Sequence, residues 1–117
     1  NKTRDVYTNY LHCLEETGDY KEAIKLVKSA IKSNPKNSIY KVDLGEVYVK
    51  MGEDDKALKS FKSAINSLPP SQYQVVSLAN RFIKMNRLNL AFETYKEGQK
   101  QMKGQYTFHY EIATLEG

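Results

Sequence analysis

Residues 38–71, which read SIYKVDLGEVYVKMGEDDKALKSFKSAINSLPPS, decide the fold. Apolar side chains recur every three or four residues on both sides of Gly52, and this spacing is typical of amphipathic helices. Glycine ends a helix easily, and the Pro69–Pro70 pair cannot continue one. The stretch therefore predicts two helices, at 38–51 and 54–67, joined by a tight turn at Gly52.

The same pattern returns when the chain is shifted by 34 residues, with small and turn-forming residues in one register: Gly18 with Gly52, Ala23 with Ala57, Ala30 with Ala64, Ile31 with Ile65, and Pro35 with Pro69. A further shift by 34 residues gives a weaker match, which aligns Asn86, Ala91, Tyr95 and Gly98 with the second unit. A fixed period of this length indicates a helical repeat protein. We predict further helix pairs at 4–17 and 20–33 and at 72–85 and 88–103, with a last helix from about 106.

Each turn between paired helices has residues suited to it. Gly18, Gly52 and Asn86 tolerate the left-handed backbone conformation that ends a helix. Asp19 and the acidic run Glu53–Asp54–Asp55 are expected to open the second helices, where they cap free N–H groups and complement the positive end of the helix dipole. The sequence thus predicts helical hairpins.

These residues carry a family resemblance. Residues 38–71 are similar to a tetratricopeptide repeat in Leu44–Gly45, Tyr48, Gly52, Ala57, Phe61, Ala64 and Pro69. The first unit matches in Tyr7, Tyr10, Leu14, Gly18, Asp19, Ala23, Ala30 and Pro35, and the third in Leu78–Ala79, Phe82, Ala91, Tyr95 and Gly98. Departures include Leu11 in a usually small slot and Lys103–Gly104 where proline is expected.

The resemblance implies an all-α fold, a right-handed superhelix (α-solenoid) of antiparallel helix pairs. We expect one domain over residues 1–117, with repeats at 4–37, 38–71 and 72–105 and a capping helix at 106–115. The missing initial methionine suggests a fragment of a longer protein. Such repeats bind partners on an extended concave surface.

The family's groove positions, carried onto this chain, imply a partner-binding lining from the three first helices: Asp5, Thr8, Asn9, His12, Glu15, Glu16, Ile39, Val42, Asp43, Glu46, Val49, Lys50, Tyr73, Val76, Ser77, Asn80, Ile83 and Lys84. Carboxylates dominate its first two repeats. Two interpretations stay open: a groove for a basic and apolar peptide, or a solvated acidic face. The chaperone-type carboxylate clamp is missing, because Thr8, His12, Glu46, Tyr73 and Ser77 occupy its slots.

Catalytic chemistry is not expected. Cys13 is the single cysteine, so it forms no intramolecular disulfide, and we expect it to be buried in helix packing, as we do Tyr10. His12 and Glu16 lie one helical turn apart, but a metal site would need further ligands. No phosphate-binding loop or nucleophile motif occurs, so neither a cofactor nor an enzyme activity is predicted.

The predicted function is a protein–protein interaction scaffold, with self-association possible through exposed repeat ends. The alternatives are a regulatory or targeting segment of a larger enzyme, and an RNA-binding helical repeat. The net charge of +4 is mild, and no aromatic residues for base stacking are interleaved with the lysines of the second helices. This favours a solvated outer face over a nucleic-acid surface. No membrane span is expected, and among compartments the cytoplasm is favoured.

Overall fold

The structure, a computed structural model, describes residues 2–102, and side chains within residues 6–101. Its helices are α1 (Lys2–Glu16), α2 (Tyr20–Ser33), α3 (Ile39–Lys50), α4 (Asp54–Asn66), α5 (Gln72–Lys84) and α6 (Leu88–Met102). Each helix predicted within residues 2–102 is confirmed, with ends within two residues of the expected ones. The expected helix at 106–115 and the Lys103–Gly104 pair lie outside the described residues.

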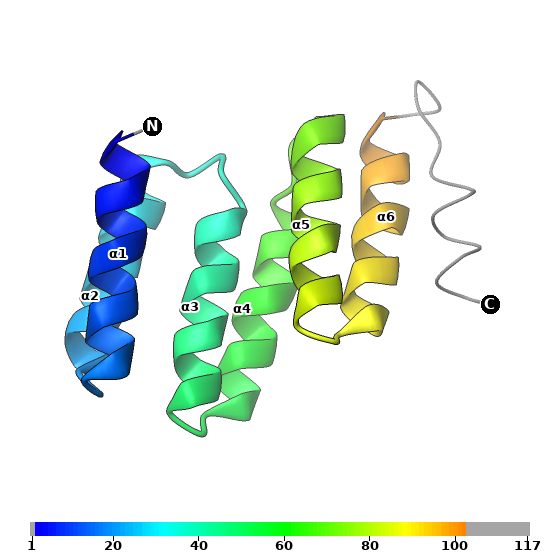
Figure 1. Cartoon of the computed structure of the whole chain (residues 1–117). Coiled ribbons are helices and arrows are strands. Elements are labelled where there is room, and N and C mark those ends of the chain that lie inside the picture. The colour runs from blue at the N-terminus through cyan, green and yellow to red at the C-terminus, as the bar shows by residue number, and fades with distance from the viewer. Residues whose placement is uncertain (1, 103–117) are drawn as a thin grey trace.

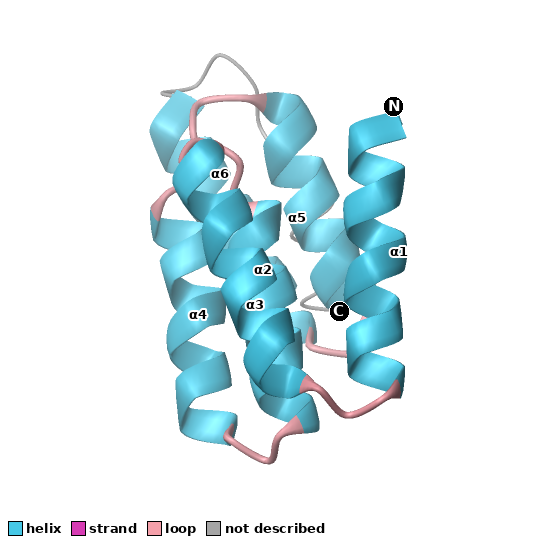
Figure 2. Cartoon of the chain, turned by 90° about the vertical axis from the view of Figure 1, so that its left-hand side faces the viewer, coloured by secondary structure: helices cyan, strands magenta, loops and turns pink. Residues whose placement is uncertain are grey.

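The helices pair into three hairpins that stand side by side in an elongated array of 42 × 27 × 20 Å. Figure 1 shows the short turns within hairpins along the lower side of the array and the loops between hairpins along its upper side. Figure 2 looks along the array, so that helices of successive hairpins overlap in the view. This is the all-α helical repeat that the sequence predicts. The right-handed sense of its superhelix stays a prediction.

The three hairpin turns share one backbone geometry. Gly18, Gly52 and Asn86 have φ angles of 77°, 80° and 60°. The next residue in each turn donates its N–H to a carbonyl five residues back: Asp19 to Leu14 at 2.9 Å, Glu53 to Tyr48 at 2.8 Å and Arg87 to Phe82 at 2.8 Å. This is the Schellman motif, which satisfies the carbonyls at a helix end. The predicted left-handed positions are confirmed.

The predicted helix caps are only partly confirmed. The carboxylate of Asp19 accepts a hydrogen bond from the Glu22 N–H at 3.4 Å. The side chain of Glu53 makes no such bond, and its carboxylate lies 3.5 Å from the ammonium of Lys56 instead. Glutamate is one methylene longer than aspartate and is a poorer N-cap. The prediction of a Glu53 side-chain cap is therefore wrong.

Two apolar clusters connect the hairpins. In the first, Val47 of α3 packs with buried residues of the first hairpin: Leu11, Leu14, Ala23 and Val27. In the second, Leu78 and Phe82 of α5 join buried residues of the second hairpin, and the rings of Phe61 and Phe82 meet edge to face with centroids 5.6 Å apart. Each later first helix thus buries apolar surface against the hairpin before it, as expected for a repeat array.

Close packing explains the glycine in the middle of α3. A Cβ atom added at Gly45 would overlap the ring of Phe61 on α4. Ala57 beside this contact is also buried. The two helices of the hairpin can approach each other because this slot has no side chain.

Two packing predictions for α1 are wrong. Cys13 is exposed, and Tyr10 is 52% exposed. One and two repeats later, the same positions contact the preceding hairpin, at Leu44 and Val47 and at Leu78 and Arg81. Among the described residues no hairpin precedes α1, so this side of α1 faces solvent.

Candidate functional site

The predicted groove residues lie on α1, α3 and α5, but they differ in accessibility. The exposed members are Thr8, Asn9, His12, Glu16, Tyr73 and Asn80, and the partly buried ones are Ile39, Glu46, Val76 and Ser77. Among the additional positions, Lys50, Ile83 and Lys84 are exposed, while Glu15 and Val49 are partly buried. Asp5 lies in α1, and its side chain is outside the described residues.

Two predicted groove residues do not reach the surface. Val42 is fully buried in the second apolar cluster, and Asp43 is 5% exposed. Both face neighbouring helices, because their positions on α3 point to the contacts between hairpins. The structure therefore removes Val42 and Asp43 from the set that a partner could contact.

Asp43 belongs to a polar network that joins all three first helices. The hydroxyl of Tyr7 on α1 donates to Asp43 Oδ2 at 2.8 Å. From α5, Arg81 Nη2 donates to Asp43 Oδ1 at 2.5 Å, and Arg81 Nε donates to Glu46 Oε1 at 2.8 Å. One guanidinium therefore holds two carboxylates of α3, a geometry that the fork of arginine favours.

The network also raises the pKa of Arg81. Burial lowers the pKa of Arg81, but the charges of Asp43 and Glu46 and their hydrogen bonds outweigh it, so the net pKa is raised. Sequence reasoning missed Arg81 as part of this surface. The available signal was a basic residue about one repeat length after Asp43 and Glu46, on the next first helix.

Other carboxylates of the predicted acidic lining also have cationic neighbours. Glu15 lies 3.3 Å from the ammonium of Lys50 on α3, and Glu16 lies 3.9 Å from the imidazole of His12. With Arg81 beside Asp43 and Glu46, the lining is much less acidic than its composition indicates. Charge alone is therefore a weak attraction for a basic partner at this surface.

The most exposed large apolar side chain in the described part of the chain lies on α5. Tyr73 is 80% exposed and lies at the edge of two shallow hollows. One hollow, of about 310 Å³, lies between the start of α3 and α5 and is lined by Asn37, Ser38, Ile39, Tyr73, Gln74, Ser77 and Leu78. The other, of about 520 Å³, follows α5 and is lined by Gln72, Tyr73, Val76, Ser77 and Asn80.

Five predicted residues thus come together around these hollows: Ile39, Tyr73, Val76, Ser77 and Asn80. Of the described residues of α1, none lines either hollow. The Gln74 side chain fixes the floor of the first one, since its carbonyl oxygen accepts from the Ser38 N–H at 3.4 Å. The hollows combine an exposed aromatic ring with hydroxyl and amide groups. Aromatic residues are enriched at protein–protein interfaces.

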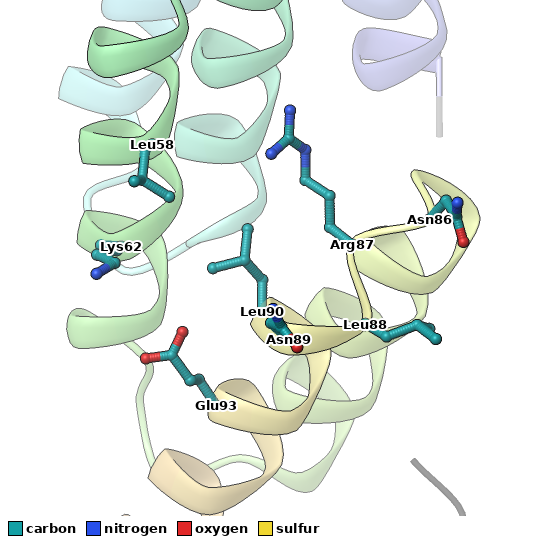
Figure 3. Close-up of a pocket in the computed structure, with 8 residues that line it drawn as sticks. All are labelled: Leu58, Lys62, Asn86, Arg87, Leu88, Asn89, Leu90 and Glu93. Carbon is teal, nitrogen blue, oxygen red and sulfur yellow. The ribbon is translucent and has the colours of Figure 1, made fainter. Parts of the chain in front are cut away.

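A third hollow, of about 550 Å³, lies between α4 and the start of α6. Figure 3 shows Leu58 of α4 and Leu90 of α6 pointing toward each other across it, while Leu88 points away from α4. The guanidinium of Arg87 stacks over the Phe61 ring at 5.0 Å. Sequence reasoning did not identify this hollow, because it lies between two second helices and not on the first-helix surface.

The lysines of the second helices are exposed, as predicted, and several have local partners. Lys25 lies 3.5 Å from Glu22, and Lys56 lies 3.5 Å from Glu53. Lys96 lies over the ring of Phe92, with its ammonium 5.2 Å from the centroid. These contacts fit a solvated outer face.

Within residues 2–102, no three His, Cys, Asp or Glu residues gather as a metal site would require. No helix in the same part of the chain has the length and apolar character needed to cross a membrane. Cys13 and His12 are neighbours on α1 that point in different directions, and both are exposed.

Comparison with known families agrees with this geometry. A family model described as a tetratricopeptide repeat matches residues 14–81, which is more than half of the chain. The chain belongs to the tetratricopeptide repeat family. Tetratricopeptide repeats are typically non-enzymatic interaction modules, and membership in this family indicates a scaffold for protein–protein interaction. No curated protein sequence matches the chain.

Proposed function

We propose that this tetratricopeptide repeat chain binds a segment of a partner protein across α3 and α5, with Tyr73 as the central contact. The observation that carries the proposal is the exposure of Tyr73, 80%, at the edge of both hollows. A tyrosine in this position offers a large contact area and a hydroxyl group while few of its bonds rotate. Exposed aromatic residues are also enriched among those that dominate binding energy.

The chemistry of the surface indicates an apolar segment with polar flanks. Tyr73, Val76 and Ile39 supply apolar contacts, and Ser77 and Asn80 supply hydrogen-bonding groups. The carboxylates of α1 and α3 already have cationic neighbours in this chain, so basic side chains of the partner would add little to binding. A partner's C-terminal carboxylate is disfavoured, because other residues occupy the positions of the family's carboxylate clamp.

Peptides selected from a random display library against the full chain test this proposal. We expect Tyr73→Ala to weaken binding of the selected peptides by more than tenfold, a change of about 1.4 kcal/mol or more. Leu88→Ala is the matched control, since Leu88 is 45% exposed and lies on α6, away from the two hollows. We expect it to bind as the parent does.

Salt dependence separates apolar from ionic binding. Affinity that changes little between low and high salt supports an apolar contact at Tyr73, because salt screens exposed charges. Two results would contradict the proposal: peptides that bind Tyr73→Ala as well as the parent, or peptides that lose affinity equally through Leu88→Ala.

A further inference from the structure

The third hollow, between α4 and the start of α6, takes no part in the proposed binding surface. We call it the outer hollow, because second helices and the turn before α6 form it. It has a volume of about 550 Å³, and its lining consists of Leu58, Lys62, Asn86, Arg87, Leu88, Asn89, Leu90 and Glu93. None of these residues lines the two hollows around Tyr73. The outer hollow is therefore a separate candidate for a contact.

The middle of the outer hollow is apolar. Leu58 is 42% exposed, and Figure 3 shows its side chain pointing toward Leu90 with the hollow between them. One repeat earlier, the position of Leu58 is held by Ile24, which is partly buried against the apolar cluster that joins the first two hairpins. Leu58 lacks the cover that its counterpart has. An apolar side chain of a partner can therefore bury surface between Leu58 and Leu90.

Arg87 holds a cation at one end of the outer hollow. The Cζ atom of its guanidinium lies over the ring of Phe61, 5.0 Å from the centroid, and Phe61 is fully buried. No ion pair or side-chain hydrogen bond among the described residues involves Arg87. A guanidinium that lies over an aromatic ring still offers the N–H groups at its edge to a carboxylate. Arg87 is thus positioned but has no anionic partner in the described part of the chain.

The other charges of the outer hollow leave the end at Arg87 electropositive. Lys62 has no ion pair among the described residues either, and Glu93 is the one carboxylate of the lining. Figure 3 draws the guanidinium of Arg87 and the carboxylate of Glu93 at opposite ends of the hollow. The start of α6 lies beside Arg87, and its helix dipole has the same sign.

The neighbours of Arg87 on its other side are already paired. There Arg87 borders a smaller hollow of about 250 Å³, which Glu46 and Lys50 also line. Glu46 binds Arg81, and Lys50 lies 3.3 Å from Glu15. Neither side chain therefore competes for the guanidinium of Arg87.

From the apolar middle and the unpaired guanidinium, we infer that the outer hollow binds an acidic and apolar segment of a partner protein. A leucine-sized side chain of the segment lies between Leu58 and Leu90, and a neighbouring aspartate or glutamate binds Arg87. Exposed ion pairs contribute little, but Arg87 is partly buried, and its fork can hold both oxygens of a carboxylate. The inference uses no residue of the Tyr73 surface and does not depend on the proposed function.

Nuclear magnetic resonance of the isotope-labelled full chain tests this site, because it detects weak binding and locates it. The probes are short synthetic peptides that each have one leucine and one glutamate at varied separation, and a matched set with glutamine in place of the glutamate. We expect the glutamate peptides to shift the amide signals of Leu58, Lys62 and residues 86–93. The glutamine peptides should bind at least about tenfold more weakly, because they lose a charge-assisted hydrogen bond to Arg87.

Arg87→Met and Lys96→Met are a matched pair of variants. Each removes one cation that lies over an aromatic ring, and Lys96 lies over Phe92 outside the outer hollow. The pair controls for the net charge of +4, which attracts any acidic peptide. We expect Arg87→Met to weaken binding of the glutamate peptides at least about tenfold and Lys96→Met to leave it unchanged.

Four results would overturn the inference. They are glutamate peptides that shift no signal of the outer hollow, glutamate and glutamine peptides that bind equally, equal losses through Arg87→Met and Lys96→Met, and shifts confined to the surroundings of Tyr73. The last result would leave the proposed function standing. The amide spectrum of Arg87→Met reports whether the variant is folded, and the glutamine peptides test the same contact on the parent chain.

Discussion

Val47 and Arg81 occupy the same position in successive repeats, and the two junctions between hairpins are built differently around them. Val47 of α3 is fully buried among apolar residues of the first hairpin. Arg81 of α5 is 28% exposed and binds Asp43 and Glu46 of α3. Both side chains face the preceding hairpin, so the repeat length determines where a contact forms.

The chemistry of each contact depends on what the preceding helix presents. Asp43 and Glu46 of α3 correspond to Asn9 and His12 of α1, which are not acidic. An arginine therefore finds two carboxylates at the second junction and would find none at the equivalent positions of the first, where Glu15 of α1 pairs with Lys50 instead. The comparison teaches that a position in a repeat predicts contact, while the partner residues decide between apolar packing and ion pairing.

The largest expected effect comes from placing an arginine at the first junction. Val47→Arg would bury a cation among apolar side chains, with no carboxylate of α1 in the equivalent positions. We expect a loss of unfolding free energy of about 4 kcal/mol or more. Urea denaturation followed by circular dichroism measures it. A smaller loss of unfolding free energy for Val47→Arg than for the reciprocal change, Arg81→Val, would contradict this comparison.

Arg81→Val makes the reciprocal change at the second junction. It leaves Asp43 buried without its cation, and we expect a loss of about 2–3 kcal/mol, at the lower end for a buried ion pair because Arg81 is partly exposed. Adding Asp43→Asn removes the buried charge and should recover part of the loss. The same denaturation experiment checks both variants. Equal stability of the parent and Arg81→Val would show that the network contributes little.

Gly45→Ala tests the close packing of the two helices within one hairpin, α3 and α4. The new Cβ would overlap the Phe61 ring, and we expect a loss of about 1–3 kcal/mol from overpacking. The equivalent position in the third repeat, Ala79, already holds a Cβ. Ala79→Gly is the control, with an expected loss of only about 0.5–1 kcal/mol from helix propensity. Thermal melts measure both. A neutral Gly45→Ala would mean that α3 and α4 are farther apart than described.

The smallest effect is expected at the third turn. Asn86 adopts the φ of 60° that Gly18 and Gly52 adopt in the other turns. We expect Asn86→Gly to change stability by no more than about 0.5 kcal/mol, while Asn86→Ala costs about 1–2 kcal/mol in the left-handed region. Calorimetry of the two variants separates them. A similar cost for both would contradict the turn geometry.

Much of the fold could be predicted from the sequence, because glycine, asparagine and proline at fixed intervals have strong local preferences. The helix ends and the left-handed turns at Gly18, Gly52 and Asn86 follow from those preferences. The burial of individual side chains was harder to predict. Cys13 and Tyr10 match buried positions of later repeats, yet they are exposed because nothing described precedes α1.

The candidate site could be predicted only in part. The positions of Tyr73, Ser77 and Asn80 follow from the repeat register, and the structure brings them together. The acidic character of the groove could not be judged from composition, because it depends on Arg81, which lies one helix away from the carboxylates it binds. Charge at a surface depends on tertiary pairing, and tertiary pairing is not local in sequence.

Thiol labelling at one repeat position in two helices tests the central claim, that stacked hairpins cover this position in α3 and leave it open in α1. The chain has a single cysteine, Cys13, so it can be compared directly with Val47→Cys in a Cys13→Ser background. In dilute solution, we expect Cys13 to react at nearly the rate of the unfolded chain. The cysteine at position 47 should react at least about a hundredfold more slowly, because its labelling requires local opening. Equal rates at the two positions, or a protected Cys13, would contradict the account.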